Sequence, residues 1–278
     1  MGKRLFVLLL LLFCACEKTS QPVEEVGLRS GEQSPEVSHV KIIAHRGVHG
    51  DTPENSLKSI EKAFAIGLDV VEFDVQLSKD GEIMIFHDEK LERMTGKAGT
   101  VEDYTKEELQ TFHLKKSNGQ FAQEVIPTLK EVFDMLGNKI NYYIEIKFPS
   151  EEIEEKLLSM VKAYDLESKV SVLSFSNGCL KRISDKNKSI PCRLLLYTEK
   201  EPPVSSLHLP DYSHLKSVVI NKGMVNYPIL LNLKRWIDTI EVYTLDTVDE
   251  VPVYGYSYIQ SVITDDPEYW LKYKKKNK

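Results

Sequence analysis

The stretch VVEFDVQL, residues 70–77, decides the fold that this sequence predicts. Successive side chains of a β-strand point to opposite faces, so Glu72 and Asp74 share one face while the apolar side chains at 71, 73, 75 and 77 share the other. The stretch NYYIEIK, residues 141–147, repeats the pattern with Glu145 on its polar face. Either stretch alone also fits the half-solvated face of an ordinary sheet, so the surrounding sequence has to decide.

From Val40 onward, short runs rich in β-branched residues alternate with helical patterns, which is typical of βα units and a parallel sheet. The extended runs occupy residues 41–45, 70–77, 82–87, 141–147, 169–175, 192–197, 216–220, 239–245 and 260–265. The helical patterns occupy residues 55–66, 105–113, 128–137, 151–163, 177–187 and 228–238. Eight strands with interleaved helices in about 240 residues predict an α/β fold, a TIM-type (β/α)8 barrel with a small insertion after the third strand. Nine runs are one more than the barrel needs, and the sequence leaves open which of them is surplus.

Capping residues and glycines mark the expected helix ends. Asn55, Thr105 and Thr128 stand where N-caps are expected. Gly67 and Gly137 stand where helices would stop. The lysine-rich segment that follows the last extended run is interpreted as a solvated tail.

The turn signal Ser78-Lys79-Asp80-Gly81 favours an antiparallel hairpin between the second and third extended runs. Such a hairpin would place His87 at the opposite end of the sheet from Asp74. For His87 to lie near the carboxylates, residues 76–82 would have to double back outside the barrel, so that the third run is parallel to the second. We expect this arrangement.

Both faces of a parallel barrel are covered, so the polar faces of residues 70–77 and 141–147 would point into the barrel mouth. Three inward carboxylates, Glu72, Asp74 and Glu145, cannot remain charged and unpaired there. One resolution is a hard divalent cation, Ca²⁺ or Mg²⁺ rather than zinc, held by carboxylate oxygens. The competing resolution is a salt-bridge network in which Lys147 and Arg46 supply the positive charge.

Two histidines follow extended runs: His45 in AHRG and His87 in IFHD. The carboxyl ends of barrel strands are where active sites form, and imidazole titrates near neutral pH, so this pair predicts a general acid and a general base. Arg46 has the forked geometry that suits a phosphate. The histidines in loops and polar stretches are interpreted as structural or incidental: His49, His113, His208 and His214.

Residues 40–270 resemble the glycerophosphodiester phosphodiesterase family. The matching motifs are AHRG, PENS, VEFDVQLSKDG, FHDEKLERMTG, GTVEDYTKEEL, VIPTLKEVF, YIEIK, VLSF and VITDDP, in the family's order. The resemblance implies a metal-dependent barrel hydrolase that cleaves glycerophosphodiesters to glycerol 3-phosphate and an alcohol. It also implies attack by the substrate's own glycerol hydroxyl through a cyclic phosphate.

The resemblance implies roles for individual residues. The implied metal ligands are Glu72, Asp74 and Glu145, the acid–base pair is His45 and His87, and the substrate and phosphate contacts are Arg46, Lys147, Glu54 and Tyr243. Asn55 would cap a helix or support the site. Two departures stand out. Asp246 adds a negative charge close to Tyr243, which places substrate preference in question, and VITDDP lacks the family's usual Gly-Val-Asp-Gly lead-in.

The N-terminus reads as an export signal. Lys3 and Arg4 precede an apolar run from residue 5 to residue 16, too short to span a bilayer, that ends in the lipobox-like Phe13-Cys14-Ala15-Cys16. We expect residues 1–15 to be a lipoprotein signal peptide, residues 16–38 to be the lipidated Cys16 and a flexible tether, and residues 39–278 to be the barrel. The expected location is the bacterial cell envelope, periplasm-facing or surface, with the lipid as membrane anchor; a soluble exported protein is the alternative.

The overall composition narrows the functional classes. The 278 residues carry a net charge of −6 and no long basic block, so a nucleic-acid partner is not expected. No protein partner is evident, and the expected partner is a small-molecule glycerophosphodiester. Cys179 and Cys192 could pair or remain thiols. The alternative functions are a phospholipase C/D-like phosphodiesterase of the same barrel type, which an apolar or basic rim would favour, and a non-catalytic phosphodiester-binding envelope lipoprotein.

Overall fold

The computed structural model describes residues 34–197 and 213–277. The expected signal peptide, the lipidated Cys16 and most of the expected tether lie outside the described residues, as does His208. Among the described residues, no helix is both long enough and apolar enough to cross a membrane.

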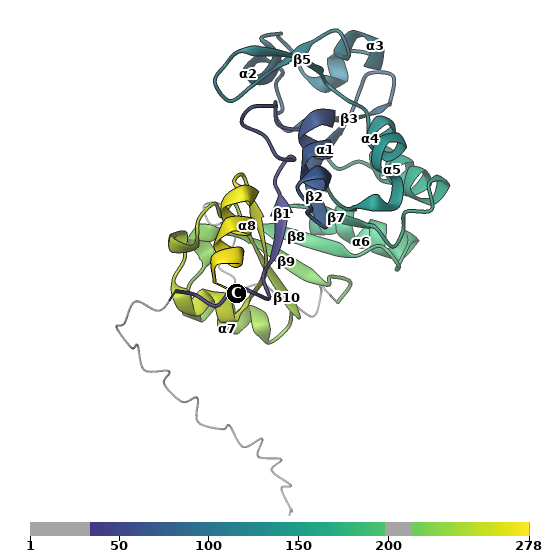
Figure 1. Ribbon diagram of the computed structural model, residues 1–278. Helices are drawn as coiled ribbons and strands as arrows, with labels where there is room; N and C mark the ends of the chain where they lie inside the picture. The colour runs from purple at the N-terminus through teal and green to yellow at the C-terminus, as the bar shows by residue number, and fades with distance from the viewer. Residues whose placement is uncertain (1–33, 198–212, 278) are drawn as a thin grey trace, which may run out of the picture. The chain divides into compact units, whose positions relative to one another are not determined.

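Eight parallel strands form a closed barrel (Figure 1). They are β1 (Lys41–Ala44), β2 (Val70–Leu77), β6 (Asn141–Ile146), β7 (Val170–Ser174), β8 (Cys192–Leu196), β9 (Ser217–Asn221), β10 (Thr239–Tyr243) and β11 (Ile259–Thr264). The barrel closes because β1 pairs in parallel with both β2 and β11. The predicted TIM-type barrel is confirmed, and β11 is its eighth strand although its lead-in departs from the family pattern.

The surplus extended run is the third, β3 (Ile83–Ile85), which pairs with β2 in antiparallel fashion: Val75 opposite Ile85 and Leu77 opposite Ile83. The expectation that this run would be a parallel strand is wrong, because the turn signal at residues 78–81 acts as a hairpin turn. β2 is long enough for both partners. Residues 70–75 pair with β6 inside the barrel, and residues 75–77 pair with β3, so Val75 pairs with both strands.

The predicted insertion follows β3 and lies at the top of Figure 1. It contains α2 (Glu92–Thr95), a 3₁₀ turn (Val101–Asp103), α3 (Lys106–Leu109) and a small sheet of β4 (His113–Lys115) and β5 (Phe121–Val125). The helix expected over residues 105–113 is therefore a single turn, which Thr105 caps as predicted. The insertion has an apolar core of its own, made by Met84, Phe86, Leu91, Met94, Val101, Leu109, Leu114 and Ile126.

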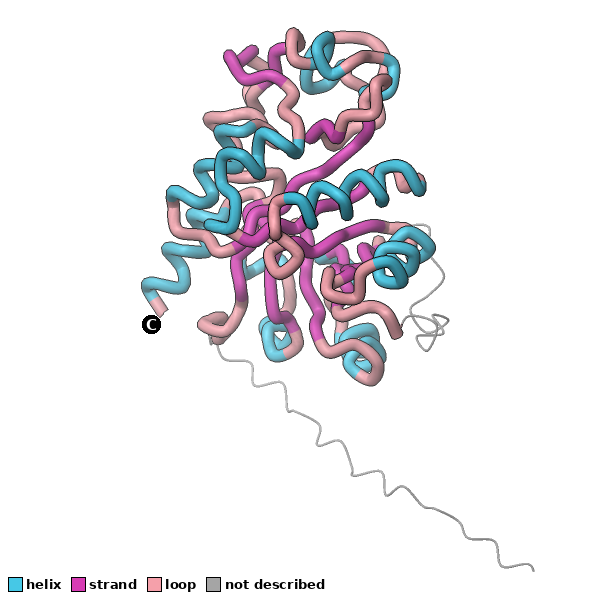
Figure 2. The backbone as a smooth tube through the Cα atoms, turned by 90° about the vertical axis from the view of Figure 1, so that its right-hand side faces the viewer, coloured by secondary structure: helices cyan, strands magenta, loops and turns pink. Residues whose placement is uncertain are grey.

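Helices surround the strands (Figure 2) and cover their outward apolar side chains. They are α1 (Leu57–Ala65), α4 (Leu129–Leu136), α5 (Glu151–Ala163), α6 (Asn177–Lys186), α7 (Tyr227–Lys234) and α8 (Pro267–Lys276). Thr128 caps α4 in a reciprocal capping box, as predicted. The N-cap of α1 is Ser56 and not Asn55, whose φ of 55° turns the chain just before the helix.

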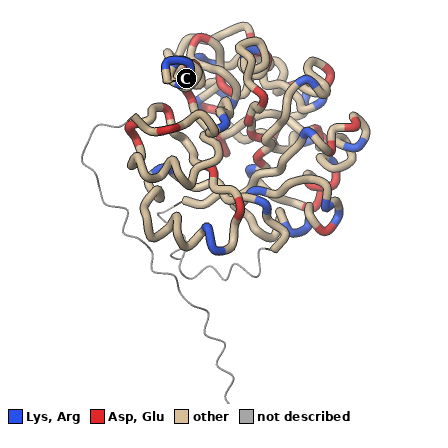
Figure 3. The backbone as a smooth tube through the Cα atoms, turned by 60° about the horizontal axis from the view of Figure 1, so that its bottom comes forward, with Lys and Arg blue, Asp and Glu red and all other residues tan. Residues whose placement is uncertain are grey.

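The C-terminal lysine-rich segment forms α8 and is not a solvated tail. The Trp270 side chain is fully buried against the barrel and donates a hydrogen bond from Nε1 to the Leu245 carbonyl at 2.9 Å. Cys179 and Cys192 are both buried free thiols. Basic and acidic residues are interspersed along the chain (Figure 3), in line with the moderate net charge.

A polar cluster fills part of the barrel interior. The fully buried Glu241 of β10 is ion-paired with Arg193 of β8, and it accepts hydrogen bonds from the hydroxyls of Tyr143 (3.0 Å), Ser217 (2.6 Å) and Ser261 (2.5 Å). The Arg193 guanidinium also lies 4.3 Å from the centre of the Tyr143 ring. The cluster thus joins five strands, β6, β8, β9, β10 and β11, through one carboxylate.

Replacing Arg193 with Met is expected to lower the free energy of unfolding by about 3–5 kcal/mol, because it leaves the buried Glu241 carboxylate without its counter-charge. Urea unfolding measures the loss. The control is Lys181→Ala, which breaks the exposed pair with Asp185 on α6 and should cost about 0.5 kcal/mol. Equal losses in the two variants would contradict the importance of the Glu241 cluster.

Candidate active site

Three carboxylates meet at the carboxyl end of two neighbouring strands. Asp74 of β2 lies opposite Glu145 of β6, and Glu72 lies two residues earlier on the same face of β2. All three are buried, with exposed fractions of 2% for Glu72, 1% for Asp74 and 8% for Glu145. One oxygen of each lies within 4.8 Å of the others, so the three could hold a metal ion together.

The protonation of the three carboxylates is shaped by their burial. Burial and the charges of Asp74 and Glu145 raise the pKa of Glu72 well above its usual range. Burial and the Asp74 charge raise the pKa of Glu145 to about 7. Burial also disfavours charge on Asp74, but the positive charges of Lys147, His87 and Arg46 outweigh it and hold the Asp74 pKa at about 2. Without a cation, burial and mutual repulsion therefore disfavour the charged forms of Glu72 and Glu145, and a bound cation would favour them.

Lys147 and Arg46, which the sequence offered as counter-charges in place of a metal ion, also lie beside the carboxylates. Lys147 Nζ lies 2.7 Å from Glu145 Oε1 and 3.6 Å from Asp74 Oδ1, and Arg46 Nε lies 3.5 Å from Asp74 Oδ2. Two cations face three carboxylates, and Arg46 is shared with Glu54 at 2.8 Å. Asp74 Oδ1 is buried and accepts no hydrogen bond from the described residues. This orphaned oxygen fits a further cation, since buried acceptors otherwise find a donor.

The loop after β1 supports the carboxylates from one side. Arg46 adopts a left-handed φ of 54°, and its backbone N–H donates to Glu72 Oε2 at 2.9 Å. Asn55 is also left-handed, and its Nδ2 donates to Asp74 Oδ2 at 2.8 Å. Asn55 therefore supports the site and does not cap the helix.

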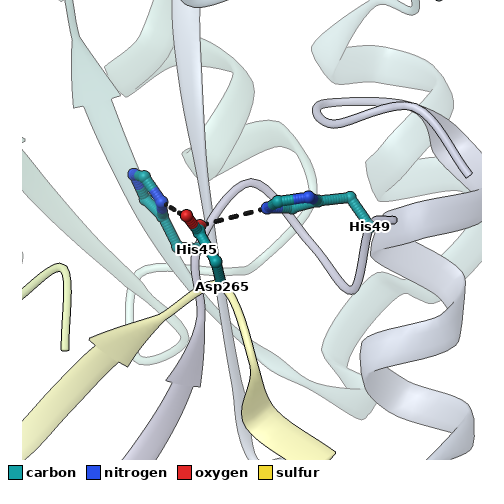
Figure 4. Close-up of side chains that lie close together, drawn as sticks. All are labelled: His45, His49 and Asp265. Carbon is teal, nitrogen blue, oxygen red and sulfur yellow. Dashed lines mark hydrogen bonds and ion pairs between the residues drawn. The ribbon is translucent and has the colours of Figure 1, made fainter. Parts of the chain in front are cut away.

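His45 directly follows β1, and its Nδ1 lies 2.6 Å from Asp265 Oδ1 at the end of the adjacent strand β11. His49 Nε2 reaches the same oxygen at 3.1 Å. Figure 4 shows the two imidazoles on either side of the Asp265 carboxylate. With Nδ1 occupied, His45 has Nε2 available for chemistry.

His87 lies near the carboxylates in spite of the hairpin. β3 runs back along the last three residues of β2, and the backbone N–H of Phe86 then donates to the Asp74 carbonyl at 3.0 Å. The expectation that a hairpin would separate His87 from Asp74 is wrong, because β2 extends past Asp74 by the length of β3. His87 Nδ1 lies 2.7 Å from Asp88 Oδ1, so this histidine also has its Nδ1 engaged by a carboxylate.

Arg93 of α2 links the two histidine-bearing loops. It donates to Asp88 Oδ2 at 2.5 Å and to Glu54 Oε1 at 2.7 Å, and Glu54 in turn accepts from Arg46. Glu54, which the resemblance implied as a substrate contact, is thus occupied by two guanidinium groups.

Tyr243 lies at the end of β10, its ring centre 6.4 Å from that of Phe175 and its hydroxyl donating to the Leu196 carbonyl at 3.2 Å. Asp246 Oδ1 accepts from the backbone N–H of Asp265 at 2.8 Å. The acidic departure in the late motif therefore holds Asp265 in place.

The residues that support the proposed site and that sequence reasoning missed are Asp88, Arg93 and Asp265. Asp265 carried a usable signal, because the last strand of a closed barrel must lie beside the first, which ends in His45. Asp88 carried another signal, since it directly follows His87. The Arg93 contacts had no such signal, because they depend on the path of the insertion.

Comparison with known proteins places the chain among phosphodiesterases. Residues 45–269 match the model of the glycerophosphoryl diester phosphodiesterase family. The chain is 32% identical over 234 residues to a glycerophosphodiester phosphodiesterase of Caldanaerobacter subterraneus subsp. tengcongensis, covering 82% of this chain and 94% of that protein.

Two solved structures are also similar. A glycerophosphodiester phosphodiesterase of Thermotoga maritima has a TM-score of 0.66 and 27% identity, covering 84% of this chain and 98% of that chain. An Oleispira antarctica phosphodiesterase in complex with the product sn-glycerol-3-phosphate has a TM-score of 0.68 and 24% identity, covering 85% and 96%. With its family model matched over most of its length, the chain belongs to the glycerophosphoryl diester phosphodiesterase family.

Proposed function

We propose that this chain, an enzyme of that family, hydrolyses glycerophosphodiesters to glycerol 3-phosphate and an alcohol with the help of a divalent cation. The observation that carries the proposal is the buried trio Glu72, Asp74 and Glu145 at the barrel mouth where His45 and His87 also lie. The names of the Caldanaerobacter and Thermotoga relatives and the product bound to the Oleispira enzyme support the same substrate class.

The proposed metal ligands are the carboxylates of Glu72, Asp74 and Glu145. Three oxygen donors in a buried site favour a hard cation, Ca²⁺ or Mg²⁺. Such a cation, when bound, supplies positive charge for the phosphoryl oxygens of the transition state. The surplus of carboxylates over ion-pair partners and the orphaned Asp74 Oδ1 support this assignment.

Arg46 and Lys147 are the proposed phosphate contacts. Both are partly exposed at the mouth, with 17% and 15% of their side chains accessible, so an entering phosphodiester can reach them. Each is held in place by carboxylates and keeps donors in excess of the contacts described above. Their charges would stabilise the phosphoryl group as negative charge develops on it.

His45 and His87 are the proposed acid–base pair. Each has Nδ1 against a carboxylate, which fixes the tautomer with the proton on Nδ1 and leaves Nε2 to accept a proton. One Nε2 takes the proton of the attacking glycerol hydroxyl, and the other, protonated, gives its proton to the departing alcohol oxygen. The two roles then reverse when water opens the cyclic phosphate.

Asp88→Asn tests the positioning of His87. The exchange is expected to lower kcat by about 10²-fold, the low end of what acid–base catalysis contributes, because the amide no longer fixes the Nδ1–H tautomer. KM should change little. The control is Asp103→Asn, a carboxylate of the insertion whose described contacts are with Thr100. An unchanged kcat for Asp88→Asn would remove Asp88 from this role.

A second candidate function is suggested by an aromatic rim, which we define as Phe148, Phe175 and Tyr197. These residues follow β6, β7 and β8 at the barrel mouth and are 51%, 43% and 41% exposed. Such a rim suits a substrate that carries an acyl chain, as in the phospholipase-like alternative. Comparing glycerophosphocholine with lysophosphatidylcholine, in the wild type and in Phe148→Ser, separates the two. A preference for the lysolipid that Phe148→Ser abolishes would favour the second function.

We further propose that the chain is exported and attached to the cell envelope by a lipid on Cys16. The basic residues Lys3 and Arg4, the apolar run up to residue 16 and the small Ala15 before Cys16 support this. In a bacterial host, Cys16→Ser is expected to move the protein from the membrane fraction to a soluble or unprocessed form. Unchanged membrane fractionation and unchanged mobility on a gel would contradict the lipid anchor.

A further inference from the structure

His45, His49 and Asp265 form a second cluster of metal-binding groups, distinct from the three buried carboxylates. One ligand atom from each of the three residues lies within 4.8 Å of the others, and His45 Nδ1 and His49 Nε2 lie 2.6 and 3.1 Å from Asp265 Oδ1. In Figure 4 both imidazoles present a nitrogen toward the carboxylate between them. The Asp265 side chain is 42% exposed, so an ion from solvent can reach the cluster.

The backbone around each of the three groups is held in place. The N–H of His45 donates to the Thr264 carbonyl at 3.0 Å, which ties the end of β1 to the end of β11. The loop that carries His49 is fixed on both sides, by a hydrogen bond from Val48 N to the Ser59 carbonyl at 2.8 Å and by one from the Ser117 hydroxyl to the Gly50 carbonyl at 2.9 Å. The three groups are therefore brought together before any ion binds.

The donor set differs in chemistry from that of the carboxylate site. Two imidazole nitrogens and one carboxylate oxygen suit Zn²⁺ and its neighbours in the first transition row, whereas Ca²⁺ and Mg²⁺ prefer oxygen alone.

We propose that His45, His49 and Asp265 bind a Zn²⁺-class cation, and that its binding inhibits the enzyme. The inhibitory part rests on the proposed role of His45. A metal bound to Nδ1 of His45 places the remaining ring proton on Nε2, because each nitrogen of neutral imidazole carries either a lone pair or a proton. Nε2 then has no lone pair with which to accept a proton from the glycerol hydroxyl.

The decisive variant is His49→Gln, since His49 has no part in the proposed catalytic machinery and glutamine can still donate a hydrogen bond to Asp265. With excess Mg²⁺ present throughout, Zn²⁺ is titrated into the glycerophosphocholine assay, and Co²⁺ binding is followed by its visible absorption. The basal activity of His49→Gln should match that of the wild type. Its half-inhibitory zinc concentration should rise by about 100-fold or more, because even the supporting partners of a metal ligand are worth about 10–100-fold in affinity.

His113→Gln is the matched control, because His113 is exposed on β4 and is not one of the three clustered groups; it should bind Co²⁺ and respond to Zn²⁺ as the wild type does. Equal inhibition of the wild type and His49→Gln, or no Co²⁺ binding that depends on His49, would overturn the proposal. Co²⁺ binding that depends on His49 but leaves activity unchanged would support the metal site and contradict the base role of His45. The experiment therefore distinguishes a failure of the proposed metal site from a failure of the proposed role of His45.

Discussion

Replacing Asp74 with Asn is expected to lower kcat/KM for glycerophosphocholine by about 10³-fold or more. The exchange keeps the size of the side chain and an oxygen for the hydrogen bond from Asn55, but it removes one of the three negative charges that would hold the cation. A cation contributes several kcal/mol to the stabilisation of transition-state charge, and each 1.4 kcal/mol is worth a factor of ten in rate. Steady-state kinetics at increasing Ca²⁺ or Mg²⁺ concentrations measures the loss.

The matched control for Asp74 is Asp69→Asn. Asp69 precedes the same strand at its other end and is exposed, so its charge should not affect the reaction. Thermal unfolding of both variants separates a loss of the site from a loss of the fold. An Asp74→Asn enzyme with the activity and metal dependence of the wild type would rule out the carboxylate trio as the metal site.

Replacing His45 or His87 with Ala is expected to lower kcat by about 10²–10⁴-fold in each case, with little change in KM. The two imidazoles serve consecutive proton transfers of one reaction, so the double variant should lose far less than the product of the two single losses. Single-turnover and steady-state assays with glycerophosphocholine measure both effects.

His113→Ala serves as the control for the histidine series, because His113 is exposed on β4 of the insertion. It should retain the activity of the wild type. If either His45→Ala or His87→Ala keeps the kcat of the wild type, that histidine has no role in proton transfer, and the acid–base pair must be sought among other residues.

The barrel and the carboxylate trio could be predicted from the sequence, because both depend on local patterns. The period-two alternation around Glu72, Asp74 and Glu145 fixes which side chains point inward once the sheet is known to be parallel. The register that brings Asp74 opposite Glu145 follows from the neighbouring positions of their strands in the barrel. All nine extended runs correspond to strands among the described residues.

The position of His87 could not be derived in this way, although the hairpin turn itself was visible. A turn signal gives the direction of the returning strand, but not how far the first strand extends beyond the barrel before it turns. Here three extra residues of β2 are matched by the three residues of β3, so the chain returns to the level of Asp74. Met84 of β3 and Phe86, which directly follows β3, pack in the apolar core of the insertion.

Asn55 and Asp265 show why support for the site is harder to read from sequence. Asn55 is a good N-cap residue, but the adjacent Ser56 takes the cap, and the left-handed backbone turns the Asn55 amide toward Asp74 instead. Asp265 contacts His45 across 220 residues of chain, and the contact exists only because the barrel closes.

Release of glycerol 3-phosphate from glycerophosphocholine, measured in the wild type and in His45→Ala with and without EDTA, tests the central claim most directly. We expect the wild type to be active, to lose activity in EDTA and to recover it with excess Ca²⁺ or Mg²⁺. His45→Ala should be nearly inactive under all of these conditions. Release that is insensitive to both the chelator and the substitution would contradict a metal-assisted, histidine-dependent phosphodiesterase.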